Sequence, residues 1–130
     1  MNRPIAGLVL LAYLCTPVSG YAAQPKIGAT VDGGIFLYRQ SVENYWDDWI
    51  AYPLMAKTKV PTSSQARATV TGEGKLNSFI GNLSINCENG KHFWESSAIG
   101  SEIFTTDNQA DKIVPSPVIK NAIKLLCKAN

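Results

Sequence analysis

The stretch LSINCENGKHFW, residues 83–94, decides how this 130-residue chain is expected to fold. Ile85 and Cys87 alternate with polar residues, which is the period-two pattern of a half-buried strand. Asn89-Gly90 supplies the two positive φ angles that a type I′ hairpin turn requires. If these two residues form the loop, Cys87 faces His92, Ile85 faces Trp94, and Cys87 points into the core. The sequence therefore predicts a β-hairpin with a cysteine on its inner face.

A C-terminal helix is the second clear prediction. Ser116 can act as its N-cap, and Pro117 suits the first helical position. Apolar residues then recur at helical spacing: Val118, Ile119, Ala122, Ile123 and Leu126. Cys127 adjoins this stripe, which must be buried against another element. A bond between Cys127 and Cys87 would dock the helix on the hairpin.

Weaker patterns complete the fold prediction. Residues 26–31 and 35–42 flank Asp32-Gly33-Gly34 and could form an opening hairpin, and residues 66–71 and 101–106 resemble further strands. Residues 60–65, with Gly72 and Gly74, are expected in exposed connections. Residues 41–55 suit either a helix or a strand. The simplest arrangement is an α+β domain: a small antiparallel β-sheet with a C-terminal α-helix packed on one face, and one disulfide.

The N-terminus has the pattern of a secretory signal peptide over residues 1–23. Arg3 precedes an apolar run from Ile5 to Cys15 that is too short for a membrane span, and small residues follow it. A buried N-terminal helix is the alternative. We expect cleavage after Ala23, with Gly20 as a second option, and a single exported domain over residues 24–130. Leu14 before Cys15 argues against a lipid anchor, because lipidation requires a small residue there.

Removal of this segment leaves two cysteines, with 11 basic and 10 acidic groups. An even number of cysteines in a small exported domain predicts a structural disulfide, and Cys87–Cys127 is the one possible pairing within the chain. A redox or metal-binding pair is the alternative. The sequence has no C-x-x-C spacing and His92 is its only imidazole, so we expect no metal site.

Several other classes of function find no support in the sequence. A net charge of +2 is too small for a nucleic-acid footprint, and no stretch beyond residue 20 is apolar enough to span a membrane. A nucleophile would need His92 as its base, and adjacent Asp47 and Asp48 diverge in either a strand or a helix. No phosphate-binding glycine loop is present. We therefore expect a protein that is not an enzyme and uses no cofactor.

Two groups of residues could bind a partner. Four aromatic residues fall within residues 45–52, namely Tyr45, Trp46, Trp49 and Tyr52. Such residues dominate binding hot spots, and the alternative is that they fill the core of a small domain. Three lysines recur every fourth residue on the C-terminal helix, namely Lys120, Lys124 and Lys128. They could attract an anionic surface or form a solvated helix face.

Residues 83–127 resemble the surface-adhesin protein E family of small exported bacterial proteins. The family carries an acidic-Cys element on a strand and a Pro-Gly-Ser motif that opens a terminal helix ending in cysteine. This chain has Asn86-Cys87 and Pro115-Ser116-Pro117 in those places, and its helix ends at Cys127. The resemblance implies an antiparallel sheet, a helix pinned by Cys87–Cys127 and a binding role. The adhesin that names the family binds host matrix proteins, but none of its binding residues carries over to a matching position.

The working hypothesis is an exported, non-catalytic binding protein of the bacterial envelope, either periplasmic or at the cell surface. Its partner would be a host matrix or envelope protein, and its oligomeric state is open. The alternative is a periplasmic inhibitor or immunity protein that blocks a toxin or hydrolase.

Overall fold

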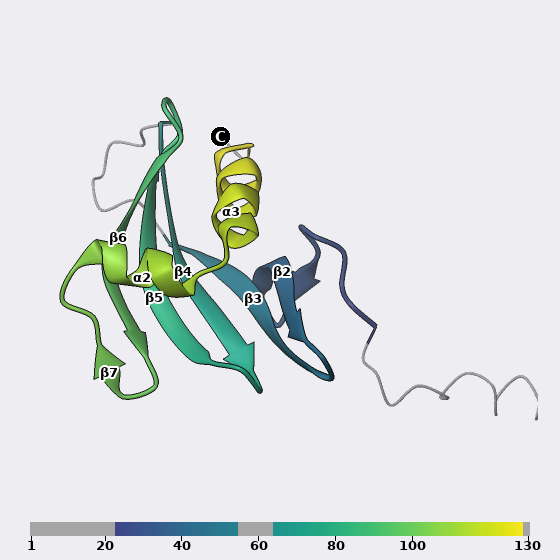
Figure 1. The fold of residues 1–130 in the computed structure, drawn as a ribbon. Coiled ribbons are helices and arrows are strands. Elements are labelled where there is room, and N and C mark those ends of the chain that lie inside the picture. Colours follow the sequence, from purple (N-terminus) through teal and green to yellow (C-terminus); the bar gives the residue numbers. More distant parts are fainter. Residues whose placement is uncertain (1–22, 55–63, 129–130) are drawn as a thin grey trace, which may run out of the picture.

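The computed structural model describes residues 23–54 and 64–128, and the signal-peptide prediction lies outside this range except for Ala23. The described residues form a seven-stranded antiparallel sheet, in which each strand pairs with its neighbours in sequence, and two helices (Figure 1). The strands are β1 (Thr30–Val31), β2 (Gly34–Val42), β3 (Tyr45–Leu54), β4 (Gln65–Gly74), β5 (Ser78–Asn86), β6 (Lys91–Ile99) and β7 (Glu102–Ile103). The helices are α2 (Asp107–Ile113) and α3 (Ser116–Lys128). The predicted antiparallel sheet and C-terminal helix are confirmed.

The opening hairpin forms at Asp32-Gly33. Both residues have positive φ, 51° and 84°, and Val31 pairs with Gly34, so the two-residue loop has the positive φ angles of a type I′ turn. The first strand is shorter than the predicted 26–31. Upstream of it, the backbone of Gly28 donates to the carbonyl of Phe36 at 2.8 Å.

The ambiguous stretch over residues 41–55 contains a strand, β3. Asp47, Trp49 and Ala51 are buried while the residues between them are partly exposed, which is the period-two pattern. β3 pairs with β2 on one side and β4 on the other. These two ladders provide hydrogen-bond partners for the backbone of β3 on both sides. The sequence pattern of residues 41–55 suited a helix and a strand alike, so it did not predict this pairing.

The predicted type I′ turn at Asn89-Gly90 is wrong. The loop has four residues, because Asn86 pairs with Lys91 and Ile85 with His92. Gly90 has a positive φ of 72°, but Asn89 is not among the residues with positive φ. The Asn89 side chain instead accepts a hydrogen bond from the Lys91 backbone at 2.9 Å. The observed register of the hairpin therefore differs from the predicted one by two residues. Because a shift of two residues leaves each side chain on the same face, Ile85 and Trp94 remain on the core face.

Two further expectations need correction. Gly72 and Gly74 lie within β4 and not in a connection; Gly72 is buried under Trp49, whose ring would be 2.6 Å from an added Cβ. Of residues 101–106, only Glu102 and Ile103 form a strand. Residues 60–63 of the other predicted connection lie outside the described residues.

The helix α2 was not predicted. It begins after Thr106, whose backbone N–H donates to the side-chain oxygen of Gln109 at 2.9 Å. This Thr-x-x-Gln pair is a capping box, so the sequence did carry a start signal for the helix. The segment has only seven residues and a single fully buried one, Ala110, which left no apolar periodicity to detect.

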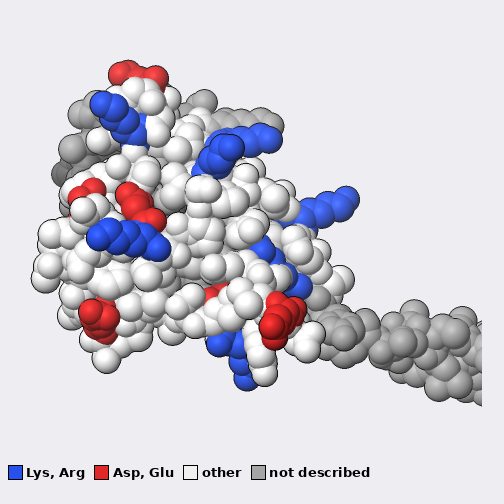
Figure 2. Space-filling view, in the orientation of Figure 1, with Lys and Arg blue, Asp and Glu red and all other residues white. Residues whose placement is uncertain are grey.

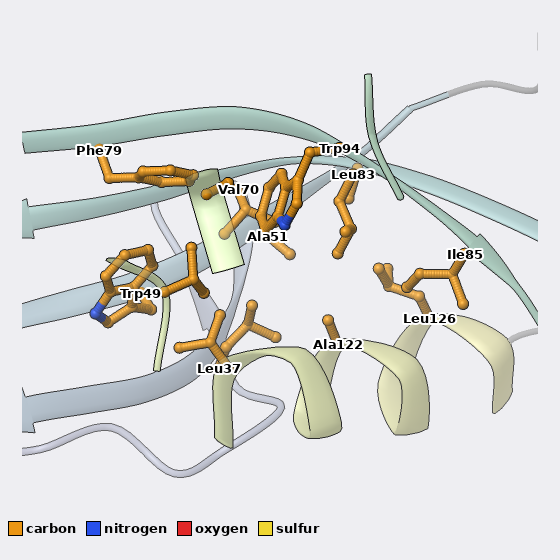
Figure 3. Packing of buried hydrophobic residues seen from close by; sticks show 14 residues of the cluster. Leu37, Trp49, Ala51, Val70, Phe79, Leu83, Ile85, Trp94, Ala122 and Leu126 are labelled. Atoms are coloured by element: carbon orange, nitrogen blue, oxygen red, sulfur yellow. The ribbon is translucent and has the colours of Figure 1, made fainter. Parts of the chain in front are cut away.

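The core lies between one face of the sheet and α3 (Figure 3). Trp49, Phe79 and Trp94 form an aromatic row across the sheet, with neighbouring ring centroids 5.3 Å apart. The α3 side chains that belong to the same cluster are Val118, Ala122 and Leu126. Burial of this apolar surface is the main stabilising contribution to the fold.

Two specific contacts tie α3 to the sheet. The predicted disulfide is confirmed: Cys87 and Cys127 are bonded, with their Cα atoms 5.5 Å apart. The Asn121 side chain donates to the backbone carbonyl of Leu37 at 2.7 Å, where the β2–β3 pairing has a bulge. None of the helices in residues 23–54 and 64–128 has the length and hydropathy needed to cross a membrane.

Candidate functional site

The aromatic segment divides between the two faces of β3. Trp49 is fully buried, so it belongs to the core, and its place among the predicted partner-binding residues is corrected. Tyr45 is 55% exposed, whereas Trp46 and Tyr52 are half-buried. Since successive side chains in a strand point to opposite faces, the four aromatic residues cannot form one binding surface.

The predicted lysine stripe lies elsewhere. Lys120 and Lys124 are exposed on α3, and Lys128 is the last residue of that helix. In Figure 1 this helix is well separated from the β2–β3 connection where Tyr45 lies. On the face shown in Figure 2, basic and acidic side chains are interspersed and do not form one basic patch. The lysines and the aromatic residues therefore do not converge on one site.

Tyr45 and Trp46 instead line a surface hollow where two β-connections meet. The hollow has a volume of about 460 Å³. We call it the hairpin hollow; its lining residues are Asn44, Tyr45 and Trp46 from the β2–β3 end and Gly74 and Lys75 from the β4–β5 end. This volume lies in the range of small-molecule sites, which is roughly 300–1,000 Å³.

Backbone contacts hold the two sides of the hairpin hollow together. The Lys75 N–H donates to the carbonyl of Trp46 at 3.2 Å, and the Leu76 N–H donates to Oδ1 of Asp47 at 2.9 Å. Gly74 is required at this point, because a Cβ there would lie 2.1 Å from the Trp46 carbonyl oxygen. The hollow is therefore formed by the fold itself.

Asp47 lies fully buried beside this junction. Its Oδ1 accepts the Leu76 N–H, while its Oδ2 is buried without a hydrogen-bond partner among the described residues. A buried polar atom without a partner costs about 1–3 kcal/mol. The fold tolerates this cost at the point where the β4–β5 connection is held against β3.

Trp46 is held in place by a neighbouring ion pair. The Arg39 guanidinium lies 4.8 Å from the centroid of the Trp46 ring. Arg39 also makes a two-point contact with the Asp48 carboxylate, at 2.7 and 3.0 Å, and its side chain is only 9% exposed. The hydrogen bond that Arg39 donates to the Asp48 carboxylate raises the pKa of Arg39 above its ordinary value, so the cation remains charged. The indole thus lies against a fixed, paired cation.

The residues considered for catalysis have structural partners. His92 is in β6, and its Nε2 lies 2.8 Å from Oδ1 of Asp111 in α2. The buried Trp94 donates to the same oxygen at 2.9 Å. Asp48 is paired with Arg39 and Asp47 holds Leu76, so these carboxylates do not face one another. Across residues 23–54 and 64–128, no cluster of three or more His, Cys, Asp or Glu could hold a metal ion.

Sequence reasoning missed the β4–β5 side of the hairpin hollow. Lys75 and Gly74 are 28 or more residues from Trp46 in sequence, and they meet it because Asp47 pairs with Gly74 in the β3–β4 ladder. The pair Gly72 and Gly74 had predicted an exposed connection, and it carried no information about which strand lies beside it. Comparisons with protein-family models, with curated proteins and with solved structures give no match to this chain.

Proposed function

We propose that this chain is an exported, non-catalytic binding protein of the bacterial envelope, with a role similar to that of surface-adhesin E proteins. The hairpin hollow is its binding site, and a host matrix or envelope protein is its partner. The observation that carries this proposal is the surface hollow with Trp46, packed against the paired Arg39 cation, at its wall and a largely exposed Tyr45 beside it. Rigid aromatic residues bind with little loss of conformational entropy.

The export part of the proposal is supported by two independent features. The Cys87–Cys127 bond requires an oxidising compartment to persist. The N-terminal sequence has the pattern of a signal peptide. Together they favour a periplasmic or cell-surface location over the reducing cytosol.

The non-catalytic part is supported by the partners of the titratable groups. His92 shares the Asp111 carboxylate with a buried tryptophan, which makes that carboxylate a structural acceptor. Asp48 is bound to Arg39 by two hydrogen bonds. The hairpin hollow is lined by no histidine, cysteine, serine or acidic side chain among the described residues.

Capture assays with matched aromatic variants test the proposal. The exported protein, its Tyr45→Ala and Trp46→Ala variants, and Phe93→Ala are passed over immobilised matrix proteins and envelope extract. Phe93 is the control, because it is 54% exposed but lies outside the hairpin hollow. We expect capture to fall with Tyr45→Ala and Trp46→Ala and to be retained with Phe93→Ala. Equal capture by all four proteins would refute a role for the hollow.

Localisation separates adhesion from the alternative role as a periplasmic inhibitor. In a small domain held by a disulfide, the hairpin hollow could also bind a protruding side chain of a toxin or hydrolase. Protease treatment of intact cells should degrade the protein if it is an adhesin. Protection of the protein until the outer barrier is opened would favour the inhibitor.

A further inference from the structure

Within residues 23–54 and 64–128, the side-chain donors of Trp46 and Lys75 make no hydrogen bond or ion pair. Two of the three tryptophans use their indole N–H internally: Trp94 donates to Asp111 at 2.9 Å and Trp49 to Gln40 at 3.4 Å. The Trp46 indole N–H donates to no group in residues 23–54 and 64–128, and the Arg39 cation lies over its ring. Lys75 likewise has no ion pair in that part of the chain.

These groups give the hollow a distinct chemical character. The side chains of Asn44, Tyr45, Trp46 and Lys75 each combine an apolar body with a polar tip, and among the described residues no purely aliphatic side chain lines the hollow. The tips supply an indole N–H, an ammonium, an amide and a phenol, so donors outnumber acceptors. No carboxylate of residues 23–54 or 64–128 lines it, although Glu43 and Glu73 lie one residue beyond its lining at each end.

The ligand that fits must therefore satisfy three conditions. It needs a weakly apolar C–H surface that can stack on the indole ring, whose face is negative. It needs many acceptor oxygens for the unpartnered donors, and a negative charge for Lys75. An apolar peptide side chain meets only the first condition, because it would leave the donors without partners.

We infer that the hairpin hollow binds an acidic saccharide, a pyranose ring stacked on Trp46 with a carboxylate directed to Lys75. This inference rests on the proposed function, and it specifies that the partner is recognised through a glycan that it carries. The Arg39 cation, which is paired with Asp48, packs on the Trp46 ring and favours one orientation of it before the ligand arrives. The hydrogen bonds from the Lys75 N–H to Trp46 and from the Leu76 N–H to Asp47 hold the backbone that carries the Lys75 side chain against β3.

The test uses one acidic probe and its neutral counterpart. The protein is exported with its own N-terminus so that the disulfide forms, and it is titrated with a hyaluronan tetrasaccharide, which bears glucuronate, and with the same tetrasaccharide after carboxyl reduction. Binding is followed by the three indole N–H signals in nuclear magnetic resonance spectra, which Trp46→Phe assigns. We expect the acidic probe to shift the Trp46 signal alone, and the neutral probe to bind about tenfold more weakly.

Variants separate the stacking contribution from the charge contribution. Trp46→Ala should weaken binding of both probes by about tenfold or more. Lys75→Gln should weaken the acidic probe to the level of the neutral one and leave the neutral probe unchanged. Lys120→Gln, an exposed lysine on α3, is the matched control and should change neither. Lys75 is exposed, so its variant keeps the test valid even if Trp46→Ala fails to fold.

Two outcomes would overturn the inference. One is no shift of any indole signal with the acidic probe at millimolar concentration. The other is binding that is unaffected by both Trp46→Ala and Lys75→Gln. If protein capture still depends on Tyr45 and Trp46 while no saccharide binds, the proposed function stands and the inference about the glycan falls.

Discussion

At the scale of single residues, Trp46 and Trp49 show how a strand assigns opposite roles to similar side chains. They are three positions apart in β3, so they point to opposite faces of the sheet. Trp49 packs on Gly72 and against Phe79 in the core, whereas Trp46 lies half-buried against Arg39. The first therefore contributes to stability through burial, and the second contributes a surface.

This difference predicts unequal losses of stability. Trp49→Ala should lower the free energy of unfolding by about 3–5 kcal/mol, since it removes a fully buried aromatic side chain. Trp46→Ala should cost less than about 1 kcal/mol, because the ring is partly exposed and its contact with Arg39 is weak. Urea unfolding followed by far-ultraviolet circular dichroism measures both. Losses of similar size would mean that Trp46 is a core residue.

Gly74 gives a second prediction at this scale. Gly74→Ala should destabilise the fold by about 1–3 kcal/mol, because the new Cβ would lie 2.1 Å from the Trp46 carbonyl oxygen and force the strands apart. Lys75→Ala, one residue later and exposed, is the control and should stay within about 0.5 kcal/mol of the parent. Thermal unfolding compares the two variants. A harmless Gly74→Ala would show that the junction beside the hairpin hollow is not tightly packed.

At the scale of elements, one carboxylate joins α2 to two residues of β6. Asp111 accepts one hydrogen bond from the buried indole N–H of Trp94 and lies within hydrogen-bonding distance of His92. The helix is too short to be stable by itself, so its position depends on such contacts and on the burial of Ala110. Asp111 thus links a surface helix to the aromatic row in the core.

Replacement of this carboxylate should loosen α2. Asp111→Ala is expected to lower the free energy of unfolding by about 1–3 kcal/mol, because it leaves the Trp94 N–H buried without an acceptor. Lys112→Ala on the same helix is the matched control. Amide hydrogen exchange in α2 should increase in the first variant only. Unchanged exchange would assign the anchoring of α2 to Ala110 instead.

At the scale of the whole molecule, the sheet is a meander whose strands pair only with their neighbours in sequence. The last helix crosses back over it, and the Cys87–Cys127 bond joins the β5–β6 loop to the end of that helix across 40 residues. In the chain-entropy account, closing such a loop stabilises the fold by about 4 kcal/mol. This is a large share of the 5–15 kcal/mol typical of a domain of this size.

Removal of the disulfide should therefore destabilise the whole domain. The double variant Cys87→Ser, Cys127→Ser should lose about 4 kcal/mol of unfolding free energy, with a marked drop in Tm. The parent protein measured under reducing conditions is the control and should lose a similar amount. A double variant as stable as the oxidised parent would show that apolar packing alone holds α3 in place.

The amino-acid sequence by itself determined those features that depend on neighbouring residues. The alternation at Leu83 and Ile85, the apolar stripe of α3 and the Asp32-Gly33 turn follow from backbone period and φ preference. Of the three cysteines, the two beyond the expected signal peptide allow one pairing. Only the tertiary structure decided that β3 is a strand, how the β5–β6 loop closes and that Lys75 meets Trp46. These features depend on hydrogen bonds between strands distant in sequence, and side-chain periodicity reports the face of a strand but not its partner or its register.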